Sequence, residues 1–137
     1  MADIQAMLTA LQTALEANGT LTALVTPYHM TAPDNVALPT LVWDVVSTEV
    51  EKGFDNFHIA RITVQFDIYS RLEAGVSAAA SAATIEDALF AQFDETALAA
   101  TSWDRGLILF QTRGVRFVDE DGLRVTSEAV ITGRTTA

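Results

Sequence analysis

Residues 58–71 alternate strictly between apolar and polar side chains. The residues of one parity are apolar: Ala60, Ile62, Val64, Phe66 and Ile68. The residues of the other parity are polar: Arg61, Thr63, Gln65, Asp67 and Tyr69. Successive side chains of a strand point to opposite faces of a sheet, so this pattern predicts a strand with one buried and one solvated face. The solvated face either holds a substrate or lies against a neighbouring subunit.

Three other segments are also predicted to be strands. Residues 40–50 are rich in Val and Leu, and their apolar positions occupy both parities through Val46, which predicts cover on both faces. A turn-rich loop joins residues 40–50 to the strand at residues 58–71, so these two strands are predicted to form a hairpin. Residues 107–118 and 123–134 are predicted to form the last two strands, with a bulge or bend at Gly114.

Two segments have the apolar spacing of helices. The first runs from Asp3 to Ala17 and ends at Asn18-Gly19, and a short turn of helix is expected just after it. The second covers residues 73–93 and is rich in alanine at its start. Its apolar stripe consists of Ala78, Ala82, Ile85, Leu89 and Phe93. Residues 27–39 and 94–106 are predicted to be irregular connections.

The order helix, strand, strand, helix, strand, strand predicts an α+β fold. Short hairpin connections favour an antiparallel sheet of about four main strands, with both helices packed on one face. The chain has 137 residues, half of them hydrophobic, which indicates a folded protein with a single domain spanning residues 1–137.

The charge balance is acidic, with 18 Asp and Glu against 8 Lys and Arg and a formal net charge of -10. A nucleic-acid binder needs a cationic surface to displace counterions, so this balance argues against that class. Two interpretations stay open: a well-solvated acidic surface, or a surface that DNA passes without binding. The N-terminus lacks the basic start of a signal peptide, and no apolar run is long enough to span a bilayer, so we expect no membrane partner.

The chain offers little that resembles an active site. It has no cysteine, which excludes disulfides, thiolate catalysis and cysteine-ligated zinc. Its only imidazoles, His29 and His58, have no serine motif beside them. The scattered glycines form no nucleotide-binding loop, and the "DEDG" turn lacks the further ligands of a calcium loop. No cofactor is therefore expected.

Paired carboxylates are the remaining candidates for acid–base chemistry. Glu49 and Glu51 would face the same way on a strand, and Glu86 and Asp87 lie on a helix. Such pairs catalyse only when burial or proximity separates their pKa values, and here both pairs lie in a polar context. An interaction protein is therefore favoured over an enzyme.

The order of several short motifs resembles the tail terminator or tail-completion proteins of long-tailed bacteriophages and related particles. These motifs are the helix ending near "NGTLTALV", then "PYH", Pro33 and "LPTLVWDVV", then "HIARITVQFDIYSR" leading into the alanine-rich helix, and finally "RFVDEDGLRVTSEAVITGR". The strand-to-helix join around "DIYSR" is the most telling. The family often has an aromatic residue after the proline that opens the first strand, where this chain has Thr40.

The resemblance implies a structural role in the virion, at the head-proximal end of the tail, after assembly in the host cytoplasm. Such proteins form a ring, generally six-fold, which stops polymerisation of the tail tube and joins the tail to the head connector. DNA passes through the lumen without specific binding. The implied partners are other copies of the chain, the tail tube protein and a connector or neck protein.

A ring subunit must bury polar strand faces and loop aromatics against its neighbours. Phe54 and Phe57 lie in the predicted hairpin loop, where they either contact a partner or fold back onto their own domain. The candidate interface residues are Phe54, Phe57, His58, Arg61, Gln65 and Tyr69.

Three alternatives stay open at this point. One is another neck or head-closure ring of the same particle. A second is a small enzyme that uses Glu49, Glu51, Asp67 or His58. The third is an acidic binding module that recognises a basic partner.

Overall fold

The computed structural model describes residues 3–32, 38–53, 57–71, 78–119 and 122–136. They form a mixed sheet in which six strands follow the order β1-β2-β3-β6-β5-β4. Four strands are long: β2 (Thr40–Lys52), β3 (Phe57–Ser70), β5 (Trp103–Asp119) and β6 (Gly122–Thr136). Two are short: β1 (Pro27–His29) and β4 (Thr96–Leu98). Every neighbouring pair is antiparallel except β1 with β2.

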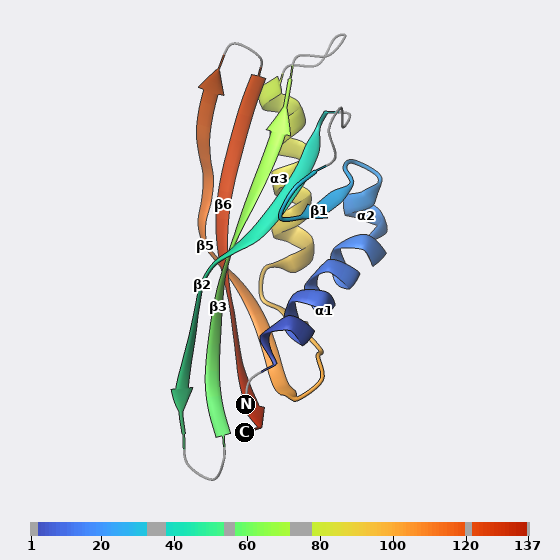
Figure 1. The fold of residues 1–137 in the computed structure, drawn as a ribbon. Helices are drawn as coiled ribbons and strands as arrows, with labels where there is room; N and C mark the ends of the chain where they lie inside the picture. Colours follow the sequence, from blue (N-terminus) through green and yellow to red (C-terminus); the bar gives the residue numbers. More distant parts are fainter. Residues whose placement is uncertain (1–2, 33–37, 54–56, 72–77, 120–121, 137) are drawn as a thin grey trace.

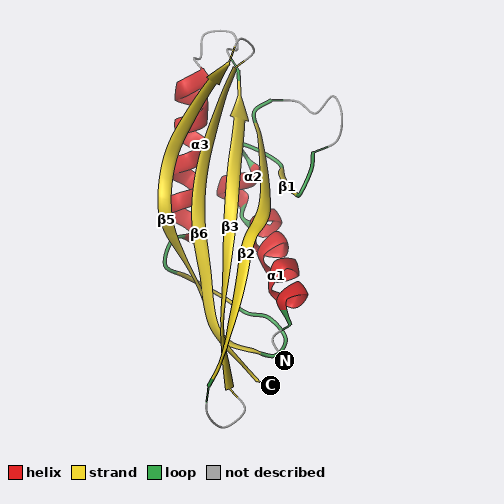
Figure 2. Cartoon of the chain, turned by 60° about the vertical axis from the view of Figure 1, so that its left-hand side comes forward, coloured by secondary structure: helices red, strands yellow, loops and turns green. Residues whose placement is uncertain are grey.

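The helices α1 (Ile4–Ala17), α2 (Gly19–Thr22) and α3 (Ala78–Phe93) cover one face of this sheet and leave the other face bare (Figures 1 and 2). The prediction for residues 58–71 is confirmed, because Ile62, Val64 and Phe66 are fully buried on the covered face. They pack in one cluster with the apolar residues of α1 and α3.

Side-chain caps define the ends of the first two helices. Asp3 accepts a hydrogen bond from the Ala6 backbone N–H at 2.9 Å and begins α1. Asn18 ends α1 and also begins α2, because its side chain accepts a hydrogen bond from the Leu21 backbone N–H at 3.0 Å. One asparagine therefore turns the chain from one helix into the next.

Glycines allow close approaches between strands. A Cβ at Gly133 would lie 2.6 Å from the Trp103 ring, and a Cβ at Gly122 would lie 2.2 Å from the Ser70 carbonyl oxygen. A side chain at Gly122 or Gly133 would therefore clash with its neighbours. Gly114 has a φ of 72° and lies within the shift of the β5–β6 register between Thr112 and Val115, which confirms the predicted irregularity there.

The predicted fold class is confirmed, and so are the four long strands and the placement of the helices on one face. The number of strands was wrong, since β1 and β4 add to the predicted order, whereas the short turn of helix expected after α1 is present as α2. β1 and β4 each have only three residues, which is too few to show a period of two. β1 also lies parallel to β2, so the sheet is mixed.

The prediction that both faces of β2 are covered through Val46 was also wrong. Leu41 and Trp43 are fully buried on the helix side, but Val46 is 55% exposed. A register shift between Val45 and Ser47 places Val46 in a bulge, beyond the part of the strand that the helices cover. In the described part of the chain, no helix is long and apolar enough to cross a membrane.

Candidate assembly surface

The bare face of the sheet carries polar side chains from all four long strands. Register places the polar parity of β3 beside the even-numbered residues of β6. Thus Arg61 lies opposite Thr132, Gln65 opposite Glu128, and Tyr69 opposite Arg124. β2 adds Asp44, Glu49 and Glu51 on one side of these two strands, and β5 adds Val115 and Phe117 on the other.

Carboxylates outnumber guanidinium groups on this bare face. The carboxylates belong to Asp44, Glu49, Glu51, Asp67, Asp104 and Glu128. The guanidinium groups belong to Arg61, Arg124 and Arg134. Arg61 pairs with Glu51 at 3.1 Å, and Arg134 pairs with Asp104. The hydrogen bond from Arg134 lowers the pKa of Asp104, and the charges of Arg134 and Arg105 act in the same direction. The face is therefore acidic after its ion pairs are counted.

A short hydrogen-bonded network occupies the middle of the face. The Asp67 carboxylate accepts hydrogen bonds from the Thr126 hydroxyl at 2.6 Å and from the Gln65 amide at 2.9 Å. All three residues are half-buried between their neighbours. The network joins β3 to β6 and uses Gln65, so this candidate residue has a structural partner within its own chain.

The structure brings four of the predicted interface residues onto one face. Phe57, Arg61, Gln65 and Tyr69 share the bare face along β3. His58 has the opposite parity and points to the helix side, where its Nδ1 is buried without a partner among the described residues. Phe57 is half-buried, and the Arg134 guanidinium lies 4.5 Å from its ring centre. Phe54 lies outside the described residues.

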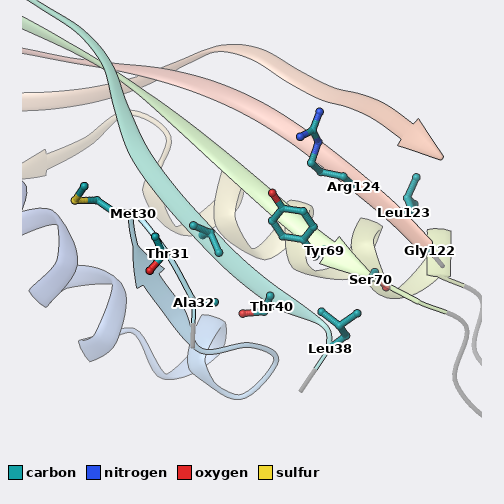
Figure 3. A pocket seen from close by; sticks show the side chains of 11 residues that line it. Met30, Thr31, Ala32, Leu38, Thr40, Tyr69, Ser70, Gly122, Leu123 and Arg124 are labelled. Carbon is teal, nitrogen blue, oxygen red and sulfur yellow. The ribbon is translucent and has the colours of Figure 1, made fainter. Parts of the chain in front are cut away.

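A hollow of about 430 Å³ lies at the end of the sheet where β3 ends and β6 begins (Figure 3). Tyr69 lines it beside Arg124, whose guanidinium lies 4.4 Å from the centre of the Phe117 ring. The buried hydroxyls of Thr40 and Ser70 also line it, and neither has a hydrogen-bond partner in the described part of the chain. Among the described residues, this end of the sheet therefore has two hydroxyls without a hydrogen-bond partner next to a predicted interface residue.

Three of the four carboxylates in the pairs named in the sequence form ion pairs: Glu51, Glu86 and Asp87. Glu49 and Glu51 share the bare face as expected, and both are exposed. Glu86 and Asp87 of α3 bind the Arg113 guanidinium of β5, at 3.1 Å and 2.5 Å. The described residues contain no group of three or more His, Asp or Glu placed to hold a metal ion.

The sequence reasoning missed a set of exposed apolar residues on the two outer long strands. They are Val46 and Val50 on β2, and Leu107, Val115, Phe117 and Val118 on β5. Val118 is 82% exposed. The only signal in the sequence is that apolar residues occupy both parities in these stretches, which resembles a strand covered on both faces. Recognising them as exposed requires the order of strands in the sheet.

Comparison with protein families matches residues 9–128 to the model described as "Tail completion protein gp17". The chain belongs to this family. Tail-completion proteins are structural proteins of phage tails, so the predicted resemblance and the predicted localisation in the virion tail are confirmed. Association with other virion proteins follows from this membership.

The fold of this tail-completion protein also occurs in a solved structure. It matches a chain from "Virion of native gene transfer agent (GTA) particle" with a TM-score of 0.64 and 17% identity. The match covers 96% of this chain and 98% of that chain. At this identity the likeness concerns the fold. A sequence comparison with curated proteins found no significant match.

Proposed function

We propose that this tail-completion protein is a tail terminator and not an enzyme. As a single domain over residues 1–137, it forms a hexameric ring on the head-proximal end of the tail tube, stops polymerisation of the tube, and joins the tail to the head connector. Membership of the tail-completion family is the observation that carries this proposal.

The acidity of the bare face supports a position for this face at the lumen of the ring. If the helices lie outward and the bare face lines the lumen, DNA meets carboxylates such as Asp44, Glu49 and Glu128. Like charges repel the phosphate backbone, so the duplex passes without binding. The hairpin end of the sheet, with Phe57, His58 and Arg61, and the opposite end, with Tyr69, are then the candidate contacts to the tube or connector, and Phe54 stays a candidate from the sequence. Gln65 lies between them on the lumen face.

Deleting the gene tests this role directly. A terminator blocks further addition of tube subunits, so particles made without it should contain tubes longer than normal and heads that carry no tail. Electron microscopy measures both tube length and attachment. Supplying the unaltered chain from a plasmid should restore uniform, attached tails.

Other outcomes identify the alternatives. Tubes of normal length beside unattached heads would overturn the terminator role in favour of a neck or head-closure ring. Normal tails attached to heads would overturn any structural role in joining. The deletion therefore distinguishes the proposals by two separate measurements on the same particles.

A further inference from the structure

Each outer long strand of the sheet is paired along only part of its outer side. β1 pairs with β2 at Leu41–Trp43, and no described strand lies beside β2 from 44 to 52. β4 pairs with β5 at Gly106–Ile108. The Asp94 carboxylate then accepts the Phe110 N–H at 2.9 Å, and no described strand lies beside β5 from 111 to 119. We name these two segments the β2 free edge (44–52) and the β5 free edge (111–119).

A free edge of this length is usually a hazard, because its unpaired N–H and C=O groups accept another strand. Here the two short strands cover opposite halves of the sheet. β1 covers the end of β2 nearest the hollow, and β4 covers the opposite end of β5. The two free edges therefore lie on opposite sides and at opposite ends of the sheet (Figure 2).

The directions of the strands allow the sheet of one copy to continue into the sheet of the next. The four long strands are antiparallel in the order β2-β3-β6-β5, so β2 and β5 run in opposite directions. A rotation about an axis along the strands would place β5 of one copy beside β2 of the next. That pair would also be antiparallel, and the alternation would continue around a closed ring.

The offset between the two free edges fits the geometry of a barrel. Val115 near the middle of the β5 free edge is level with Asp67 of β3, and Thr48 in the middle of the β2 free edge is level with Ile62. Asp67 and Ile62 are about 17 Å apart along β3, and four strands are about 19 Å wide. If the ring brings the two free edges to the same height along its axis, the strands must tilt by about 40° from that axis. This tilt lies within the roughly 35–45° of closed barrels.

Both free edges also carry exposed apolar side chains. The exposed apolar residues Val46 and Val50 lie on one free edge, and Val115, Phe117 and Val118 lie on the other. A joint between the edges would remove part of this apolar surface from water. Charge is not what joins them, because Glu49 and Glu51 lie on the bare face whereas Arg113 and Arg116 lie on the helix side, beside Glu86 of α3.

We infer that the β2 free edge of one copy pairs with the β5 free edge of the next, so that the sheets of the ring form one continuous barrel with the helices outside. The occupant of each edge is a second copy of this chain. This inference rests on the proposed ring and adds the strands that join its subunits. The short strands β1 and β4 limit this joint, because each occupies the half of its outer strand that must not pair with another copy.

Cysteine cross-linking tests the joint, because the chain has no cysteine of its own. Ser47 and Glu49 of β2 share the bare face with Val115 and Phe117 of β5. Four double variants combine Ser47→Cys or Glu49→Cys with Val115→Cys or Phe117→Cys, in particles that carry the variant chain. After oxidation, at least one should give a ladder of covalent oligomers up to the full ring, and a reductant should return it to monomer.

Matched controls make the ladder specific. Each single-cysteine variant can form dimers at most. Thr132→Cys with Val115→Cys keeps two cysteines on the bare face, but Thr132 lies on the inner strand β6, so no ladder is expected. Attached tails of normal length without a ladder from any of the four variants would overturn the joint and leave the terminator role intact. A ladder in a protein whose deletion leaves tails normal would overturn the role and not the joint.

A second measurement needs no substitution. Amide hydrogen exchange of the unaltered chain should slow on the order of tenfold or more at 44–52 and 111–119 when the free chain enters the particle, because paired edge amides exchange only by opening. Unchanged exchange in both segments would also overturn the joint.

Discussion

Trp43 shows how one residue links three parts of the molecule. It is fully buried on the helix side of β2, and its indole N–H donates a 2.6 Å hydrogen bond to the Gln12 side chain of α1. The His29 ring of β1 stacks on it, with 3.9 Å between ring centres. The short strand β1 and the helix α1 are therefore held to β2 by the same side chain.

Trp43→Phe should lower the free energy of unfolding by about 1–3 kcal/mol, because it leaves a cavity and removes the partner of the Gln12 oxygen. Urea denaturation followed by circular dichroism measures the loss. The chain offers a matched control in Trp103, which is half-buried and donates to the Asp3 carbonyl at 2.8 Å. Trp103→Phe should cost less, about 1 kcal/mol or below. An equal or larger loss at Trp103 would contradict this ranking.

At the scale of elements, α1 depends on a local cap as well as on its buried stripe. Met7, Leu11 and Leu15 are fully buried against the sheet, whereas the start of the helix lies near the protein surface. The cap at Asp3 is therefore the contact that decides whether the first turn stays formed.

Asp3→Ala should lower the free energy of unfolding by about 1 kcal/mol, because the Ala6 N–H loses its acceptor. Asp3→Asn keeps an acceptor at the same place and should restore most of that stability. Thermal denaturation of both variants makes the comparison. If the asparagine variant lost as much stability as the alanine variant, the carboxylate charge and not the hydrogen bond would be the source of the effect.

For the molecule as a whole, the proposed lumen gives the acidic face a measurable consequence. Glu128→Lys reverses a charge on the bare face, in the middle of the sheet. Particles should still assemble, but the new cation in each subunit attracts phosphate and should slow the release of DNA by about tenfold. The effect should weaken as salt is raised, because salt screens the attraction.

Release of DNA from purified particles, followed with a dye at several salt concentrations, measures this effect. Glu16→Lys is the control, since it makes the same charge change on an exposed position of α1, on the other side of the sheet. Equal slowing by both variants would indicate a general charge effect and would contradict the proposal that the bare face lines the lumen.

Local patterns in the sequence were sufficient to predict the long elements. The alternation in β3, the stripe of α1 and the turn residues between strands act over neighbouring positions, because side-chain direction repeats every two residues in a strand and every 3.6 in a helix. The burial of Ile62 and Phe66 and the shared face of Arg61, Gln65 and Tyr69 follow directly from such patterns. The family resemblance likewise depends on the order of these local motifs.

Tertiary structure decided which strands are neighbours, and with that it decided the candidate site. β1 and β4 are too short to leave a periodic signal, and they exist because a longer strand offers them partners. Val46, Val115 and Phe117 appear in the sequence as apolar residues that could equally belong to a core. Val115 and Phe117 are exposed because the β5–β6 register places them on the bare face, and Val46 is exposed because it lies in the bulge of β2. Pairing between distant segments decides that outcome, and periodicity along one segment carries no information about it.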